Sequence, residues 1–259
     1  MDKVTMGIDI GSSASKCVIL KNGEEIIGKS VISVGTGTSG PGRVIKAALE
    51  EARLEMEDMD FVIATGYGRN SIPEATIEMS ELSCHAYGTH FLFPDARTVI
   101  DIGGQDAKVL NIADDGSLIN FVMNDKCAAG TGRFLDVMSR ILEVDISELG
   151  HYSKMSTKQV NISSTCTVFA ESEVISQLSK DVHKSDIIKG IHKSVAGKVS
   201  GLARRIGLKS DIVLTGGLAQ NTGLVKELED ELKHKIQTSP LSQCVGALGA
   251  ARLAYRHLA

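Results

Sequence analysis

The sequence has no tryptophan, few other aromatic residues and no long apolar run. No stretch approaches the ~18 apolar residues that a membrane-spanning helix needs, so we expect no membrane partner. A run of Lys or Arg is also lacking and the formal net charge is −4, which argues against nucleic acid as a main partner. Residues 4–9 already have the pattern of a strand, with no secretory leader before them. We therefore expect a cytoplasmic protein.

A disulfide framework is not expected either, because a cytoplasmic chain of 259 residues with five cysteines should keep them as thiols or metal ligands. Hydrophobic residues make up 42% and charged residues 23%, which is the composition of a soluble globular protein with a sizeable core. Glycine is abundant, and its 26 copies concentrate in short turns. These turns carry most of the information on function.

Two segments repeat one pattern, since residues 6–16 resemble residues 99–108. Each reads as a strand, an Asp-Ile-Gly turn and a second strand, followed by a further turn and strand. A second pair follows in the same order: residues 60–66 resemble residues 211–217, and each is a short buried strand that ends in Thr-Gly. The alternative is a single α/β sheet in which the similarity of these segments arose by chance. Two motif pairs that occur in the same order argue against it.

Helical stretches precede both Thr-Gly strands, at residues 42–56 and 186–206. We therefore predict an α/β fold made of two strand-strand-strand-helix-strand-helix units. The expected domains are a first lobe at 1–94, joined by a C-terminal helix at 245–259, and a second lobe at 95–244. That last helix is rich in glycine and alanine, which allows close packing against a neighbour.

The two Asp-Ile-Gly turns have the chemistry of a phosphate clamp. In each, backbone N–H groups can face phosphate oxygens, and glycine lets the backbone approach closely. The carboxylates of Asp9 and Asp101 stand at strand ends, where they can hold Mg²⁺ through water. A P-loop is excluded, because residues 11–16 lack the second glycine and lead into a strand.

With residues 215–217, the turns resemble the actin, sugar-kinase and Hsp70 ATPase superfamily. The resemblance implies a duplicated actin-like (ribonuclease H-like) fold, with two lobes that move around a nucleotide cleft. It implies that Asp9, Asp101 and Gln105 serve Mg²⁺ and water. A solvated strand lysine is the alternative reading of Lys16. The implied contacts of the ATP or ADP phosphates and adenosine are Gly11, Ser12, Ser13, Ala14, Ser15, Lys16, Gly103, Gly104, Gln105, Gly216, Gly217 and Gln220.

Two cysteines stand apart from the others. Cys17, Cys84 and Cys244 have apolar or helical surroundings and are expected in the core. Cys127 and Cys166 are each expected at a helix N-terminus, where the positive end of the helix lowers the pKa of a thiol. These positions are compatible with four roles for each cysteine: a nucleophile, a redox thiol, a metal ligand or a buried structural residue. An iron-sulfur cluster needs four thiolates, which a symmetric dimer would supply two by two.

Over essentially its whole length, the sequence resembles the activators of 2-hydroxyacyl-CoA dehydratases. Among them it is most similar to those that serve (R)-2-hydroxyglutaryl-CoA dehydratase in glutamate-fermenting anaerobes. The segments that carry the resemblance are residues 34–37, 64–69, 100–106, 127–136 and 164–173.

This second resemblance implies a homodimeric ATPase of an anaerobic bacterium, with one 4Fe-4S cluster that bridges the subunits. The implied ligands are Cys127 and Cys166 of each chain. Ferredoxin or flavodoxin would supply one electron, and ATP hydrolysis would drive it into the dehydratase. There the electron would make a ketyl radical of the acyl-CoA, so that water can leave.

Two rival functions share the phosphate turns. One is a small-molecule kinase of the same superfamily, similar to pantothenate kinase, with Asp101 as its base. The other is an actin-like filament or regulatory ATPase without catalysis on a second substrate. Against the latter, Cys127 and Cys166 would have no reason to stand at helix starts.

Overall fold

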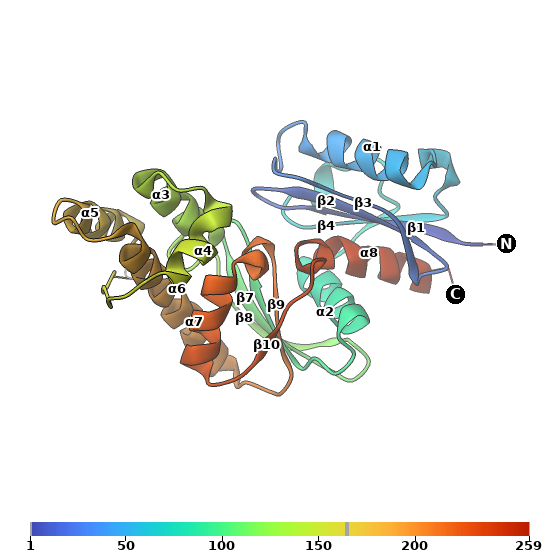
Figure 1. Cartoon of the computed structure of the whole chain (residues 1–259). Coiled ribbons are helices and arrows are strands. Elements are labelled where there is room, and N and C mark those ends of the chain that lie inside the picture. Colours follow the sequence, from blue (N-terminus) through green and yellow to red (C-terminus); the bar gives the residue numbers. More distant parts are fainter. Residues whose placement is uncertain (1, 164–165, 259) are drawn as a thin grey trace. The chain divides into compact units, whose positions relative to one another are not determined.

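The computed structural model describes residues 2–163 and 166–258 (Figure 1). Ser164 and Thr165 of the activator motif, and Ala259 of the predicted last helix, lie outside the described residues. The chain divides into two compact units. Unit 1 is Met1–Ala96, Ile112–Ile119 and Gln243–Ala259, and unit 2 is Arg97–Asn111 and Asn120–Ser242. None of the described helices has the length and apolarity to cross a bilayer.

Unit 1 is built on a five-stranded mixed sheet in the order β3-β2-β1-β4-β5. The central strand β1 pairs antiparallel with β2 and parallel with β4. Its strands are β1 (Val4–Ile10), β2 (Ser15–Lys21), β3 (Glu25–Ile32), β4 (Phe61–Thr65) and β5 (Ile77–Glu78). Its helices are α1 (Gly40–Ala52), α2 (Glu81–Leu92) and α8 (Val245–Arg256), with 3-10 turns η1 (Met56–Asp58) and η2 (Arg69–Ser71).

Unit 2 repeats this sheet in the order β10-β9-β6-β7-β8. Its strands are β6 (Thr98–Ile102), β7 (Ala107–Ile112), β8 (Leu118–Asn124), β9 (Ile212–Thr215) and β10 (Ile236–Gln237). Its helices are α3 (Gly132–Leu142), α4 (Leu149–Lys154), α5 (Thr167–Leu178), α6 (Lys184–Ile206) and α7 (Thr222–Leu232). The 3-10 turns of unit 2 are η3 (Ile146–Glu148) and η4 (Gly217–Gln220), while η5 (Ser242–Cys244) begins at its last residue and continues into unit 1. The turn between β7 and β8 groups with unit 1.

The register of the two sheets confirms the predicted duplication. Asp9 stands opposite Lys16 on β2 and Thr65 on β4. Asp101 stands opposite Lys108 on β7 and Thr215 on β9. Each strand-end carboxylate therefore has a lysine on its antiparallel side and a threonine on its parallel side. Unit 2 differs by the additional helices that precede α6.

The helices cover both faces of the unit 1 sheet. One core cluster joins Met6, Ile8 and Ile10 to Val44 and Ala48 of α1. Helix α8 lies on the other face, alongside α2 (Figure 1). The helix predicted at 42–56 ends earlier, at Ala52, because Arg53 takes a left-handed φ of 57° and its N–H bonds back to the carbonyls of Leu49 and Glu50.

The small residues of α8 pack against α2 at backbone distance, as the composition predicts. A Cβ atom added to Gly249 would overlap the carbonyl of Cys84 on α2, and one added to Gly88 would overlap the carbonyl of Val245. The two helices therefore touch along glycines on both sides, and no larger side chain fits without moving one helix.

Buried His192 joins α6 to the start of α7. Asn221 caps α7 by accepting the N–H of Leu224 on its Oδ1, so its Nδ2 faces His192 Nε2 at 3.0 Å as the donor. The Nε2 atom must then be an unprotonated acceptor. Burial lowers the pKa of His192 from its ordinary value of 6.5 to about 4.

We expect Gly249→Ala to destabilise the protein by roughly 3 kcal/mol, because the new methyl group forces α8 away from α2. Gly201→Ala is the matched control, since a Cβ at that exposed position of α6 meets nothing within 4 Å. It should stabilise the helix by up to about 1 kcal/mol. Urea unfolding midpoints measure both, and equal effects would contradict the packing argument.

Stability should fall as the pH drops from about 6.5 to about 4, because the unfolded chain protonates His192 while the folded chain keeps it neutral. The contribution of neutral His192 to the free energy of unfolding is fully present above the pKa of this residue in the unfolded chain. Its loss at low pH amounts to roughly 3 kcal/mol. His192→Gln should remove this part of the pH dependence, whereas the same change at exposed His234 should not. Melting temperatures between pH 4 and 7 decide the point; parallel profiles for wild type and His192→Gln would refute it.

Candidate functional site

Turn one connects β1 to β2 in unit 1. The N–H of Gly11 donates to the carbonyl of Ala14 at 3.0 Å, which closes the turn. Lys16 Nζ lies 3.1 Å from Asp9 Oδ2. Of the turn's hydroxyls, that of buried Ser15 donates to the carbonyl of Val34, so it serves the fold. Ser12 is half-buried and Ser13 exposed, which leaves these two positions accessible to a ligand.

Turn two connects β6 to β7 in unit 2 and has the same closing bond, from the N–H of Gly103 to the carbonyl of Asp106 at 2.9 Å. Lys108 Nζ lies 2.9 Å from Asp106 Oδ2 and 3.4 Å from Asp101 Oδ2. The hydroxyl of Thr215 donates to Asp101 Oδ1 at 2.8 Å. Gly104 is half-buried and Gln105 exposed, so both are within reach of a ligand.

Sequence reasoning did not place Lys108, Asp106 or Thr215 in the site. The signal was present for Lys108, because the offset that relates Asp9 to Asp101 also relates Lys16 to Lys108. The signal for Thr215 was the repeated Thr-Gly strand end, of which only Gly216 and the next glycine, Gly217, were assigned a role, as adenosine contacts. In the structure its threonine instead orients the carboxylate of turn two.

A glycine after each Thr-Gly strand packs against the strand-end carboxylate. Gly66 and Gly216 both have a φ of 85°, a conformation that residues with a Cβ rarely adopt. A Cβ on Gly66 would lie 2.5 Å from Asp9 Oδ1, and one on Gly216 would lie 3.0 Å from Asp101 Oδ1. Both the backbone conformation and the close approach therefore require glycine at these positions.

The predicted adenosine residues lie just beyond β9. Gly216 donates its N–H to the carbonyl of Ser242 at 3.0 Å, so that group is already engaged. Gly217 is exposed and begins η4. The side chain of exposed Gln220 donates to the carbonyl of Ser239 at 3.2 Å, a bond that a ligand would have to replace or tolerate.

Turn two is also bonded to the start of α3. The N–H of Gly132 donates to the carbonyl of Gly103 at 2.9 Å, and that of Arg133 donates to Gly104 at 2.7 Å. Turn one has a counterpart bond, from the N–H of Thr36 to the carbonyl of Gly11 at 3.0 Å. Each turn is therefore bonded to the segment that follows the third strand of its unit.

Cys17, Cys84 and Cys244 are buried, as predicted, whereas Cys127 and Cys166 are half-buried. Burial raises the pKa of Cys17, and that of Cys84 to about 12, so both are inert neutral thiols. Cys244 is also buried, and its pKa is raised for the same reason. The two half-buried thiols, Cys127 and Cys166, are the accessible ones.

The expected helix N-terminus is found at Cys166, which caps α5, but it is wrong for Cys127. Helix α3 begins at Gly132 after the cap Thr131, because a turn intervenes in which Thr131 donates its N–H to Ala128. Cys127 lies in the loop after β8, where Asn124 Nδ2 donates to its carbonyl. Its Sγ is 3.9 Å from Lys198 Nζ, so a lysine supplies the positive charge there.

The two half-buried thiols precede helices that contact each other. Helix α3 packs against α5, which brings together the elements that follow the two cysteines. Within 2–163 and 166–258, no three His, Cys, Asp or Glu side chains form a metal-binding group. Two thiols amount to half of a four-thiolate set. Helix α5 also exposes Val168, Phe169 and Ile175, an apolar surface beside Cys166.

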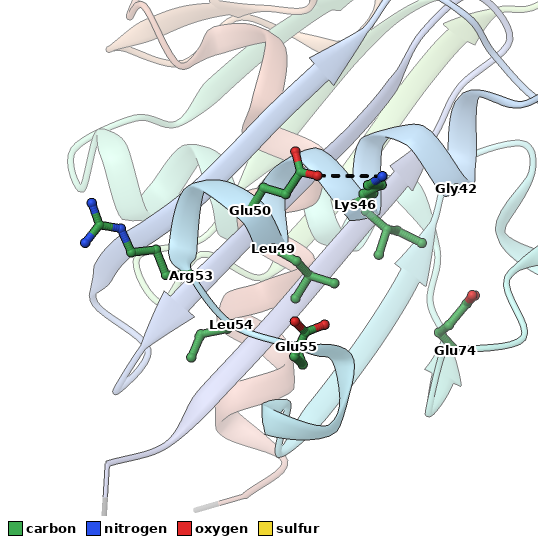
Figure 2. A pocket seen from close by; sticks show the side chains of 9 residues that line it. Gly42, Lys46, Leu49, Glu50, Arg53, Leu54, Glu55 and Glu74 are labelled. Atoms are coloured by element: carbon green, nitrogen blue, oxygen red, sulfur yellow. Dashed lines mark ion pairs between the residues drawn. The ribbon is translucent and has the colours of Figure 1, made fainter.

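A hollow beside α1, lined also by Leu54, Glu55 and Glu74, is separate from these residues (Figure 2). It extends to Glu74 and carries an ion pair of 3.8 Å between Lys46 and Glu50. Its charged side chains are exposed and of both signs. None of the site residues predicted from the sequence lines it, and we assign it no part in the site.

Two repeated units with these turns define an ATPase-type fold of the actin and sugar-kinase class. A glucokinase of the ROK family from Streptomyces griseus has this fold, with a TM-score of 0.61 and 13% identity over 98% of this chain and 99% of its own. Residues 6–254 match the model of the BadF/BadG/BcrA/BcrD ATPase family, and the chain belongs to that family.

Relatives of known role are highly similar. The (R)-2-hydroxyglutaryl-CoA dehydratase activating ATPase of Acidaminococcus fermentans is 61% identical, over all of both chains. The crystal structure of that dehydratase's component A has a TM-score of 0.96, covering 98% of each chain. The activator of 2-hydroxyisocaproyl-CoA dehydratase from Clostridium difficile, solved with bound ADPNP, has 55% identity and a TM-score of 0.96, covering 98% of this chain and 95% of its own. The resemblance to dehydratase activators is confirmed.

We expect Lys16→Met to weaken the binding of ADP about tenfold to a hundredfold, because it would remove the charge-assisted phosphate contact that the superfamily resemblance implies. Lys16→Arg should keep most of the affinity. Lys3→Met is the matched control, since it breaks an exposed pair with Asp60 in the same unit. Calorimetry measures the dissociation constants, and an unchanged value for folded Lys16→Met would favour the reading of a solvated lysine.

Proposed function

We propose that this chain is a homodimeric ATPase that couples ATP hydrolysis to one-electron transfer into a 2-hydroxyacyl-CoA dehydratase, thereby activating it. The dehydratase for (R)-2-hydroxyglutaryl-CoA is the proposed partner, on the strength of the 61% identity to its activating ATPase. The observation that carries the electron-transfer part is the pair of half-buried thiols beside packed helices α3 and α5.

ATP is proposed to bind through both turns. Lys16 and the accessible positions of turn one would contact phosphates, with Gly103, Gly104 and Gln105 completing the contacts from turn two. Asp9 and Asp101 would hold Mg²⁺ through water, as suits hard oxygen ligands, while Gln105 would orient the attacking water. Gly216, Gly217 and Gln220 would contact the adenosine. The proposed functional lobes are 1–94 with 245–259, and 95–244.

A 4Fe-4S cluster would be held by Cys127 and Cys166 of each of two chains. When bound, it supplies a one-electron reductant of low potential. Lys198 would place a positive charge beside the Cys127 ligand. The exposed apolar residues of α5 would be covered by the second copy. Ferredoxin or flavodoxin is the proposed electron donor, in the cytoplasm of an anaerobe that ferments amino acids such as glutamate.

The hydrogen bonds between turn two and α3 support a link between nucleotide and thiols. The first two N–H groups of α3 are held by Gly103 and Gly104, and α3 packs against α5. A change of phosphate state at turn two would therefore displace the helices that follow both cysteines. Helix shifts of this kind are an established means of coupling sites.

The kinase alternative would have Asp101 as its base. One oxygen of this buried carboxylate accepts from Thr215 and the other pairs with Lys108. The same carboxylate could orient a hydrated cation, so our choice between the two functions rests on the 61% identity to a dehydratase activating ATPase.

Protein purified without oxygen should contain about four irons and four sulfides per dimer. Cys127→Ala and Cys166→Ala should each lose the iron, since each removes two of the four ligands from a dimer. Cys84→Ala, which changes a buried thiol of the core, should keep it. Iron and sulfide analysis with the visible spectrum gives the result. A colourless wild-type protein that phosphorylates an added alcohol would establish the kinase instead.

The coupling to hydrolysis has its own test. Activation of the dehydratase should need ATP and should fail with a non-hydrolysable analogue, even when the cluster is reduced. Equal activation with the analogue would show that binding alone drives the transfer.

A further inference from the structure

The loop that carries Cys127 is held by hydrogen bonds at both of its ends. Asn124 Nδ2 donates to the carbonyl of Cys127 at 2.8 Å. Thr131 donates its N–H at 3.0 Å and its hydroxyl at 2.7 Å to the carbonyl of Ala128. Ala129, between these bonds, is buried in the core of unit 2. The position of the thiol is therefore set by a well-anchored backbone.

A single lysine of α6 reaches this thiol. Lys198 is half-buried, and its Nζ lies 3.9 Å from Cys127 Sγ, which is a long N–H···S contact. Its neighbours on the helix, Val195 and Val199, are buried in the same core as Ala129. The core therefore fixes the side of α6 from which Lys198 approaches the loop.

Gly130 leaves the space that the stem of Lys198 occupies. Its φ of 97° is one that residues with a Cβ rarely adopt. A Cβ at this position would lie 2.9 Å from Lys198 Cγ and 3.3 Å from Lys198 Cβ. The loop and the lysine therefore fit each other closely. The charges of Asp125 and Lys126, which precede the thiol, are exposed and opposite in sign, so solvent screens them.

A positive N–H donor beside a metal-bound sulfur favours the reduced state of the metal group. Reduction adds one electron and makes no bond, so the net charge of the group becomes more negative by one. An ammonium group nearby stabilises that added charge, and partial burial weakens the screening by water. Hydrogen bonds to the sulfurs and nearby charge are among the factors that set the potential of an iron-sulfur cluster.

We propose that Lys198 acts through Cys127 to raise the reduction potential of the iron-sulfur cluster, and is thus a positioning residue for electron transfer. The inference deepens the proposed function, on which it rests for the presence of the cluster. A raised potential makes it easier for the electron donor to load the cluster. It also makes the onward transfer into the dehydratase depend on another source of energy, which is ATP in the proposed function.

The test compares the midpoint potential of the cluster among variants at position 198. Lys198→Met removes the charge and the donor but keeps a long stem, Lys198→Gln keeps an N–H donor without charge, and Lys198→Arg keeps both. Lys193→Met is the matched control, because it removes an exposed lysine from the same helix. The potential is measured without nucleotide, by EPR during reduction with a viologen dye that supplies the electron.

We expect Lys198→Met to shift the equilibrium away from the reduced cluster about tenfold, which lowers the midpoint by about 59 mV. Lys198→Gln should lower it less, while Lys198→Arg and Lys193→Met should stay close to wild type. An unchanged midpoint in Lys198→Met, or an equal fall in Lys193→Met, would overturn the inference.

The iron content of each variant guards this comparison. If Lys198→Met holds no iron, Lys198→Gln supplies the midpoint in its place. Loss of iron from both variants would also overturn the inference, because Lys198 would then be needed to assemble the cluster and not to set its potential. Wild-type protein that holds no iron and sulfide would instead refute the proposed function.

Discussion

The structure of both units depends on how one buried carboxylate is satisfied at the end of a central strand. Asp9 and Asp101 are nearly inaccessible to solvent, and burial of an unpaired charge is strongly unfavourable. Each is therefore flanked by a lysine from the antiparallel neighbour, at a register position that the sheet itself fixes. A slip of one residue would turn the lysine to the opposite face of the sheet and leave the carboxylate alone. The pairing of each carboxylate with its lysine and the register of the sheet therefore depend on each other.

The same constraint explains where glycine is required. The parallel neighbour ends in Thr-Gly at the level of each carboxylate, and its glycine must take a positive φ while leaving room for the carboxylate oxygen. On unit 1 the constraint reaches α8, because a Cβ on Gly246 would lie 2.8 Å from Asp9 Oδ2. The small residues of this helix therefore serve two purposes. They let α8 approach α2, and they leave space for the buried charge.

Much of this was readable from the sequence, because it depends on local patterns. The repeated Asp-Ile-Gly and Thr-Gly motifs predicted the strands and their duplication, and apolar spacing predicted α6 to within two residues of its start. The predictions that were wrong or incomplete depend on details of the backbone. Four small residues before Gly132 form a turn that separates Cys127 from α3. The double pairing of Lys108 was missed because it appears only once strand register and a charged turn residue are combined in space.

The duplication also suggests why the thiols belong to the second repeat. In each unit, the carbonyl of the turn's first glycine accepts an N–H from the segment after the third strand: Thr36 bonds to Gly11, and Gly132 bonds to Gly103. In unit 1 this segment leads into α1, which covers its own sheet. In unit 2 it begins α3 directly, with a second bond from Arg133, and the loop before it holds Cys127. Both repeats thus bond the turn to the segment after the third strand. In the second repeat this segment follows an accessible thiol and begins a helix that also contacts the helix after Cys166.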